Sequence, residues 1–489
     1  MSPPDSVAGF DPNDSPSHFR RHRRRIGGLL ALVAIYLVVA YVLPRPVAVA
    51  AGGWRITAIF LATIAGLMLQ PLPGAPLMLI GLMMFVLVGG MPMGEALGGF
   101  ASPSVWLVLS AMLMARVLRD SGIARRIALL FVRQFGSSSL GIAYSLVMTD
   151  VTLASGVPSI TARGASIILP ITRSIAELYD SRPGPTASRL GEFLMAAIYQ
   201  GSGVACAMFM TGQASNVLAA GLAAKFAHVQ ITWTSWLIAG LVPGLVSATL
   251  VPYVVYRMLT PATRRTPGAA SYARDELVTM GPMRWREWVV VGVMVSVVGL
   301  WMSSQWSGLD VTLVALAGLA VLLISDVLRW QDALAEHSAW DVFVWYGGLL
   351  TMGEALNKTG STTAFAAWVG AGFGQLPWMG VLLATLVVYF YAHYAFASIT
   401  AHILAMFPPF VTMLIGLGTP PELAVYSLAC MANLTAGLTH YGTTTAPIVF
   451  AEGYVSLRDW WRVGFVVSVV NLLVWTTIGF AWWRVLGYW

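Results

Sequence analysis

Long apolar runs separated by short polar segments make up most of the chain, and this pattern predicts its secondary structure. A helix needs about 20 apolar residues to cross the hydrocarbon core of a bilayer. Two long runs are interrupted near Gly212 and Gly442, which predicts helices broken at membrane depth. We therefore expect an all-α polytopic membrane protein with eleven transmembrane spans. The predicted spans are 26-43, 54-71, 75-92, 103-118, 191-224, 232-256, 287-304, 309-327, 340-356, 421-452 and 461-485.

Two further apolar stretches, 140-177 and 376-416, are too long for one helix each. The tetrapeptide Ser-Ile-Thr-Ala lies in the middle of both, at 159-162 and at 398-401. A polar element inside apolar sequence divides each stretch into two half-helices. Because unwound backbone at membrane depth must be buried in protein or line a cavity, we expect two re-entrant hairpins whose tips carry this element.

Composition and charge indicate a membrane protein and argue against a soluble or nucleic-acid-binding protein. Hydrophobic residues make up 57% of the 489 residues and charged residues only 10%, against about 25% charged in soluble domains. The net charge of +7 does not indicate nucleic-acid binding, because the arginines lie in short loops between apolar runs. With the N-terminus inside, 22 of the 28 Lys and Arg fall in cytoplasmic segments. This bias predicts an inner-membrane protein with a cytoplasmic N-terminus.

The two halves of the chain have matching elements, which predicts inverted repeats. Gly122 precedes a short segment in the first half, as Gly360 does in the second. Residues 1-25 are expected to be a disordered cytoplasmic tail, 26-256 the first repeat, 257-286 a cytoplasmic linker and 287-485 the second repeat. The expected parts of the repeats are scaffold spans 26-118 and 287-356, interfacial helices 123-135 and 361-374, hairpins 140-177 and 376-416, broken helices 191-224 and 421-452, and spans 232-256 and 461-485.

Four polar clusters, at the two hairpin tips and the two helix breaks, carry the candidate chemistry. A half-helix that follows a break presents free N–H groups and the positive end of its dipole, and hydroxyl groups add neutral donors. This combination binds carboxylates. An isolated Ser or Thr more often bonds back to its own helix, but four clusters in repeat-related positions favour a substrate site. The predicted substrate-binding residues are Ser159, Thr161, Thr211, Gly212, Ser215, Asn216, Ser398, Thr400, Thr439, Gly442, Thr443, Thr444, Thr445 and Pro447.

Two basic residues follow the tetrapeptides and complete the predicted site. Arg163 is the only Lys or Arg predicted at membrane depth, where a cation needs a partner. We expect it to bind a substrate carboxylate, with an ion pair to Asp150 as the structural alternative. His402 occupies the equivalent place in the second repeat and is assigned the same role. Functional and structural roles both remain open for Asp150, Glu354, Glu452, His393 and His440.

Cofactor and enzyme chemistry have little support in the sequence. Cys206 and Cys430 lie in apolar runs and match no disulfide framework or metal-ligand spacing. The spans contain no nucleophile elbow or pair of metal ligands. We therefore expect no cofactor and no metal site. A membrane-embedded enzyme and an anion channel are the alternatives outside the transporter class.

The motifs resemble those of the divalent anion:sodium symporter family. The resemblance rests on 158-164, 396-402 and 438-447 and extends over residues 26 to 485. More narrowly, they are similar to the di- and tricarboxylate exchanger branch, which includes the plastid 2-oxoglutarate/malate translocator and the citrate/succinate and tartrate/succinate antiporters. The resemblance implies a homodimer, an elevator mechanism and substrates such as succinate, malate, 2-oxoglutarate, tartrate or citrate.

One departure from the family pattern bears on ion coupling. The family has Asn at the centre of its Ser-Asn-Thr signatures, whereas this chain has Ile160 and Ile399. In sodium-coupled members these tips help to form cation sites, so the resemblance implies that sodium coupling is lost. Arg163 and His402 are then expected to supply the positive charge. A buried charge that is uncompensated in the empty carrier would enforce exchange. The alternative within the same fold is a sodium- or proton-coupled symporter.

Overall fold

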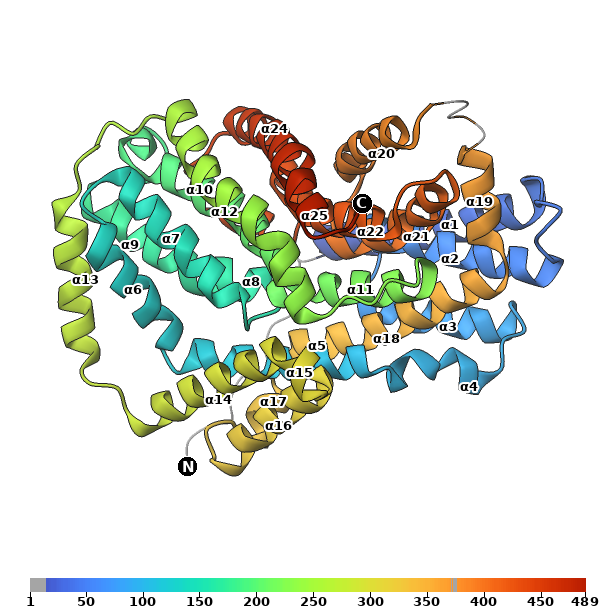
Figure 1. The fold of residues 1–489 in the computed structure, drawn as a ribbon, viewed down its shortest axis with the longest axis horizontal. Coiled ribbons are helices and arrows are strands. Elements are labelled where there is room, and N and C mark those ends of the chain that lie inside the picture. The colour runs from blue at the N-terminus through green and yellow to red at the C-terminus, as the bar shows by residue number, and fades with distance from the viewer. Residues whose placement is uncertain (1–14, 371, 373–375) are drawn as a thin grey trace, which may run out of the picture.

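The computed structural model describes residues 15–370, 372 and 376–489, and within these residues it contains helices and loops but no β-strand (Figure 1). Only the backbone is described for residues 15–24, 305, 362, 365 and 368–370. Helix α1 (Ser15–Leu37) begins inside the segment predicted as a disordered tail, so residues 15–25 are helical. Residues 1–14 of that predicted tail lie outside the described residues.

Every predicted span coincides with helical structure. The predicted first repeat contains α1, α2 (Ala51–Leu69), α3 (Gly74–Leu87), α5 (Pro103–Asp120), α10 (Gly191–Met208) with α11 (Ala214–Phe226), and α12 (Trp233–Met258). The predicted second repeat contains α14 (Trp285–Met302), α16 (Val311–Ile324), α18 (His337–Lys358), α22 (Pro421–Leu434) with α23 (Ala446–Ala451), and α24 (Leu457–Val474) with α25 (Phe480–Val485).

Length and composition alone qualify seven helical segments of the described residues as membrane spans. Two of the seven, Trp378–Ala395 and Ile399–Gly416, are the arms that the sequence predicts to form the second hairpin. Helix α10 is not among the seven, and it is buried over nearly its whole length. Protein rather than lipid surrounds such a helix, so it need not be apolar on every face. The total of eleven spans stays a prediction.

The first hairpin consists of α7 (Ser139–Ala154), α8 (Ile160–Arg163) and α9 (Leu169–Leu178), and the second of α20 (Trp378–Ala392) and α21 (Ile399–Gly416). Ser159 caps α8 by accepting a hydrogen bond from the N–H of Ala162 at 3.2 Å, and Ser398 caps α21 through the N–H of Ala401 at 3.4 Å. A side-chain oxygen at this position satisfies a free N–H of the first turn. The repeated tetrapeptide is therefore a helix start, with Ser as the cap and a buried Ile as the first helical residue.

The first broken helix changes direction at η6 (Met210–Gly212), between α10 and α11. The side chain of Asn216 donates to the carbonyl oxygens of Cys206 at 2.8 Å and Phe209 at 2.9 Å, at the end of α10 where regular α-helical hydrogen bonding stops. A Cβ atom on Gly212 would lie 2.5 Å from the carbonyl oxygen of Cys206. Glycine and asparagine are thus the residues that make this break possible.

The remaining elements frame the two hairpins. Helix α6 (Ile123–Phe135) covers the segment predicted as an interfacial helix, and α19 (Ser361–Gly370) lies in the segment 361-374 predicted as its counterpart, of which residues 371, 373 and 374 lie outside the described residues. The predicted linker contains a further helix, α13 (Pro267–Met280), which packs on α6 through an ion pair between Arg125 and Glu276 at 2.6 Å. In Figure 1, α13 and α6 lie at one edge, α1 to α4 lie at the opposite end, and α5, α11 and α18 run between them.

We expect Gly122→Ala and Gly360→Ala each to lower the free energy of unfolding by about 1–2 kcal/mol. Both glycines have a left-handed backbone, with φ of +84° and +74°, directly before α6 and α19. Neither site is crowded, because the nearest atoms to an added Cβ are 3.4 Å and 3.8 Å away. Thermal unfolding of the purified protein measures the effect. Gly292→Ala, in the open interior of α14, is the control and should not destabilise.

Candidate functional site

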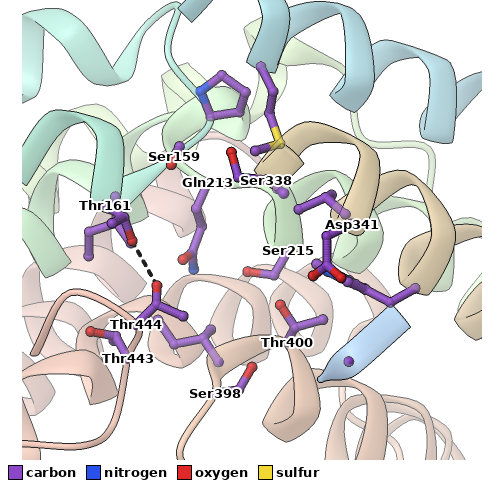
Figure 2. A pocket seen from close by; sticks show the side chains of 18 of the residues that line it. Ser159, Thr161, Gln213, Ser215, Ser338, Asp341, Ser398, Thr400, Thr443 and Thr444 are labelled. Atoms are coloured by element: carbon purple, nitrogen blue, oxygen red, sulfur yellow. Dashed lines mark hydrogen bonds between the residues drawn. The ribbon is translucent and has the colours of Figure 1, made fainter. Parts of the chain in front are cut away.

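A cavity of about 830 Å³ lies between two groups of elements (Figure 2). One wall is formed by residues 158–162, 213–215, 397–401 and 443–444, from the hairpin tips and helix breaks. The opposite wall is formed by α5, α18 and the loop between α2 and α3, all of which belong to the predicted scaffold. Tertiary folding has therefore placed the four predicted polar clusters around one space.

Seven of the predicted substrate-binding residues line this cavity. Hydroxyl groups from both repeats face it, as Figure 2 shows. Thr161 Oγ1 of the first tip lies 2.7 Å from Thr444 Oγ1 and 3.0 Å from Thr445 Oγ1 of the second break. The N-terminus of α11, a helix of 13 residues, also faces the cavity. The seven residues are Ser159, Thr161, Ser215, Ser398, Thr400, Thr443 and Thr444.

The other predicted residues do not line the cavity, and most of them are buried. Thr211 donates to the carbonyl oxygen of Ser155 at 2.7 Å and accepts from Trp233 Nε1 at 3.0 Å, so it joins the first break to the first tip. Thr439 is buried, and its hydroxyl has no hydrogen-bond partner among the described residues. The predicted residues that do not line the cavity are Arg163, Thr211, Gly212, Asn216, His402, Thr439, Gly442, Thr445 and Pro447.

Arg163 is fully buried and has its charge matched inside the protein. Its Nε lies 2.6 Å from Asp150 Oδ1, and its Nη1 donates to the carbonyl oxygens of Gly212, at 2.6 Å, and Val157. Its Nη2 lies 3.2 Å from the sulfur of Cys206. The structural alternative for Arg163, the ion pair with Asp150, is therefore present. The guanidinium holds the first tip against the first break, and none of these contacts is with the cavity.

A pair of histidines makes the equivalent connection in the second repeat. His393 Nε2 lies 2.9 Å from the carbonyl oxygen of Gly442, and His393 Nδ1 lies 2.9 Å from His402 Nδ1. Both rings are buried. A carbonyl oxygen only accepts, so His393 Nε2 carries the hydrogen, and His402 Nδ1 donates to His393 when both rings are neutral. The pair thus joins the second tip to the second break.

The remaining candidates whose role the sequence left open are engaged elsewhere. Glu354 forms an ion pair with Lys225 at 3.1 Å, and Glu452 lies 3.8 Å from Arg173. His440 accepts a hydrogen bond from Trp461 Nε1 at 3.2 Å. These contacts satisfy the side chains locally, and none of the three residues lines the cavity.

Several cavity residues were missed by sequence reasoning. Gln213 lies inside the predicted break motif and donates to Asn433 Oδ1. Ser338 and Asp341 come from α18, and Figure 2 shows both beside the hydroxyl cluster. Gln213 was detectable, because it lies between residues already chosen. The scaffold residues carried no signal, because only tertiary packing brings α18 to the hairpin tips.

An ion-pair cluster lies where the cavity reaches the loop before α18. Glu336 Oε2 is 3.3 Å from Arg116 Nη1 and 3.2 Å from Arg119 Nη2, and Ser338 also donates to Glu336. Burial opposes ionisation of Glu336, but the hydrogen bonds from Ser338 and Arg119 and the two nearby guanidinium charges hold its pKa below the ordinary value. The carboxylate therefore stays ionised and neutralises part of the positive charge of Arg116 and Arg119.

We expect Arg163→Gln and Asp150→Asn each to lower the free energy of unfolding by about 3–5 kcal/mol, because each leaves an unpaired buried charge. The loss of unfolding free energy in the double variant should be smaller than the sum of the losses in the single variants, since the double variant removes both charges. Thermal unfolding in detergent measures all three. Arg173→Gln, at an exposed ion pair, is the control and should lose about 1 kcal/mol or less. Additive losses would contradict the pairing.

Comparisons with known proteins agree with this architecture. Residues 23–489 match the family described as the sodium:sulfate symporter transmembrane region. The chain is 41% identical to chloroplastic dicarboxylate transporter 1 of Arabidopsis thaliana over 94% of this chain and 83% of that protein. It is 40% identical to the putative malate transporter YflS of Bacillus subtilis, over 94% and 96%. The citrate/succinate antiporter of Escherichia coli is 29% identical, over 93% and 97%.

Solved structures show likeness at the level of the fold alone. The structure of Neisseria gonorrhoeae MtrF has a TM-score of 0.56 at 15% identity and covers 82% of this chain and 84% of its own. The family match extends over nearly the whole chain and includes every element that forms the cavity. The chain is a multi-pass membrane transporter, and it belongs to the divalent anion:sodium symporter family, in the branch of the dicarboxylate transporters.

Proposed function

We propose that this protein exchanges di- or tricarboxylate anions, of the succinate, malate, 2-oxoglutarate, tartrate or citrate type, across the membrane without sodium. The observation that carries the proposal is the cavity lined by hydroxyl groups from both tips and both breaks. Neutral hydroxyl donors and a helix N-terminus bind carboxylate oxygens. They also release them readily, because the two arginines among the described lining residues, Arg116 and Arg119, are paired with Glu336. The names of the similar dicarboxylate transporters support the same substrate class.

Transport without sodium is supported by the basic side chains that lie between each hairpin tip and its neighbouring helix break. In the first repeat, the guanidinium of Arg163 lies between the carbonyl oxygens of Val157 and Gly212. Carbonyl oxygens of this kind are ligands for a hard cation such as sodium, and here they bind a side-chain cation. In the second repeat, His393 binds the carbonyl oxygen of Gly442. Protein groups thus make contacts that a bound sodium would make.

The reason for exchange differs from the one expected from the sequence. Asp150 compensates the charge of Arg163, so an uncompensated arginine is not what would prevent the empty carrier from reorienting. The proposal of exchange relies instead on the similarity to the citrate/succinate antiporter. A sodium- or proton-coupled symporter of the same fold is the alternative, and counterflow experiments distinguish the two.

We also propose an elevator mechanism, which the position of the cavity supports, and a homodimer, which the resemblance to the family implies. The two walls of the cavity belong to the predicted transport unit and the predicted scaffold, so sliding one against the other would move the site across the membrane. The cavity reaches Arg116, Arg119 and Glu336, on the side that the arginine distribution predicts to be cytoplasmic. We therefore propose that this structure is the inward-facing state.

Vesicles reconstituted with the protein should take up labelled succinate or malate only when they are loaded with a counter-dicarboxylate. Uptake should be the same in sodium and in choline buffer, because the proposed exchange involves no sodium. Counterflow with and without a sodium gradient is the measurement. Vesicles without protein are the control. Sodium-driven uptake into empty vesicles would contradict exchange and favour the symporter.

Thr444→Val should weaken succinate binding about tenfold or more, because a hydrogen bond to a charged group contributes about 1.5–3 kcal/mol. Valine keeps the shape and removes only the hydroxyl. The dissociation constant of the purified protein measures the effect. Thr152→Val is the matched control, since that hydroxyl donates to the carbonyl oxygen of Met148 in its own helix and lies outside the cavity. Equal affinities for the Thr444 variant and the wild type would remove Thr444 from the site.

A further inference from the structure

The charged residues on the cavity wall differ in whether they have a partner of opposite charge. The charged residues that line it are Arg116, Arg119, Glu336 and Asp341. Glu336 pairs with both arginines. Asp341, by contrast, takes part in no ion pair among the residues whose side chains the structure describes. An unpaired carboxylate on the wall of this cavity would repel an anionic substrate. Its role therefore cannot be to attract the substrate.

Asp341 is held in this position by the scaffold. It lies in the first turns of α18, is exposed, and interacts with the backbone N–H of Ala75 near the start of α3. In Figure 2 its side chain points toward the part of the cavity that holds Ser215 and Thr400. The hydroxyl groups of the transport unit therefore face a fixed negative charge on the scaffold.

A fixed charge discriminates between ligands by their charge, because its Coulomb energy with a ligand grows in proportion to the ligand's charge. Size alone does not exclude tricarboxylates here, since the cavity of about 830 Å³ is within the range of ordinary ligand sites. We propose that Asp341 determines specificity by charge and disfavours trianions relative to dianions. This inference rests on the proposed transport of carboxylates and deepens it.

The repulsion also depends on the position of the transport unit. Asp341 belongs to the scaffold, whereas Ser215 and Thr400 belong to the proposed moving unit. The carboxylate and the bound anion therefore face each other only when the unit occupies the position seen here. Asp341 lowers the affinity for the anion on this side of the membrane and so promotes its release there.

The test compares Asp341→Asn with the wild type in binding to the purified protein. The ligands are succinamate, succinate and citrate, which carry about one, two and three negative charges at pH 7.5. Asparagine keeps the shape of the side chain and one carbonyl-type oxygen, and it removes the charge. The gain in affinity should grow with ligand charge, by about twofold to tenfold for each unit. High salt should reduce this gain, because the cavity is accessible to counter-ions.

Two further variants separate charge from structure. Asp341→Glu keeps the charge and should retain the wild-type preference for succinate over citrate. Asp332→Asn removes an exposed acid that lies 4.0 Å from Arg116 and does not line the cavity, and it should leave all three affinities unchanged. Asp341→Ser, which also offers a short acceptor, replaces Asp341→Asn if the latter fails to fold.

The outcomes distinguish this inference from the function on which it rests. An equal change for all three ligands would show that Asp341 has only its structural role at the start of α3, and would overturn the proposal. Unchanged affinities in Asp341→Asn, with normal binding of succinate to the wild type, would overturn it as well while leaving the proposed function intact. If no carboxylate binds to the wild type, the proposed function and this inference both fail.

Discussion

The buried ion pair between Arg163 and Asp150 is the interaction on which the first half of the site depends. A guanidinium at membrane depth is stable only if its charge and its donors are satisfied. Asp150 supplies the charge, and the carbonyl oxygens of Val157 and Gly212 accept hydrogen bonds. Those carbonyls belong to the tip and to the break, two segments of irregular backbone. The ion pair therefore stabilises both segments and fixes their relative position.

The second repeat solves the same problem with different chemistry. Its tip and break are joined through His393 and His402, which carry no fixed charge and rely on ring nitrogens. Irregular backbone near the membrane centre must have partners within the protein. In each predicted repeat, buried polar side chains thus connect the tip to the break. This arrangement leaves the hydroxyl groups of the tetrapeptides available on the opposite side, where they face the cavity.

The cavity is asymmetric in charge although its hydroxyl groups come from related elements. Thr161 and Thr400 occupy equivalent places in the two repeats, and both line it. The facing scaffold supplies an acid, Asp341, from only one of the repeats. In the proposed elevator mechanism, a site built from similar donors and an asymmetric wall would bind the same anion with different affinity in its two positions.

The repeat relation between the two halves stays a prediction from matching motifs, whereas the helices, the tips and the breaks were determined by the sequence itself. They follow from apolar run length, glycine and helix-capping chemistry, all of which are local. Gly122 and Gly360 illustrate this, since each has the left-handed backbone that only glycine adopts readily. Only the tertiary structure decided that Arg163 pairs with Asp150 rather than facing the cavity. It also decided that Asp341 lies on the cavity wall. Ion pairs between distant residues, and the side chains that face a cavity, depend on how helices far apart in the sequence pack together.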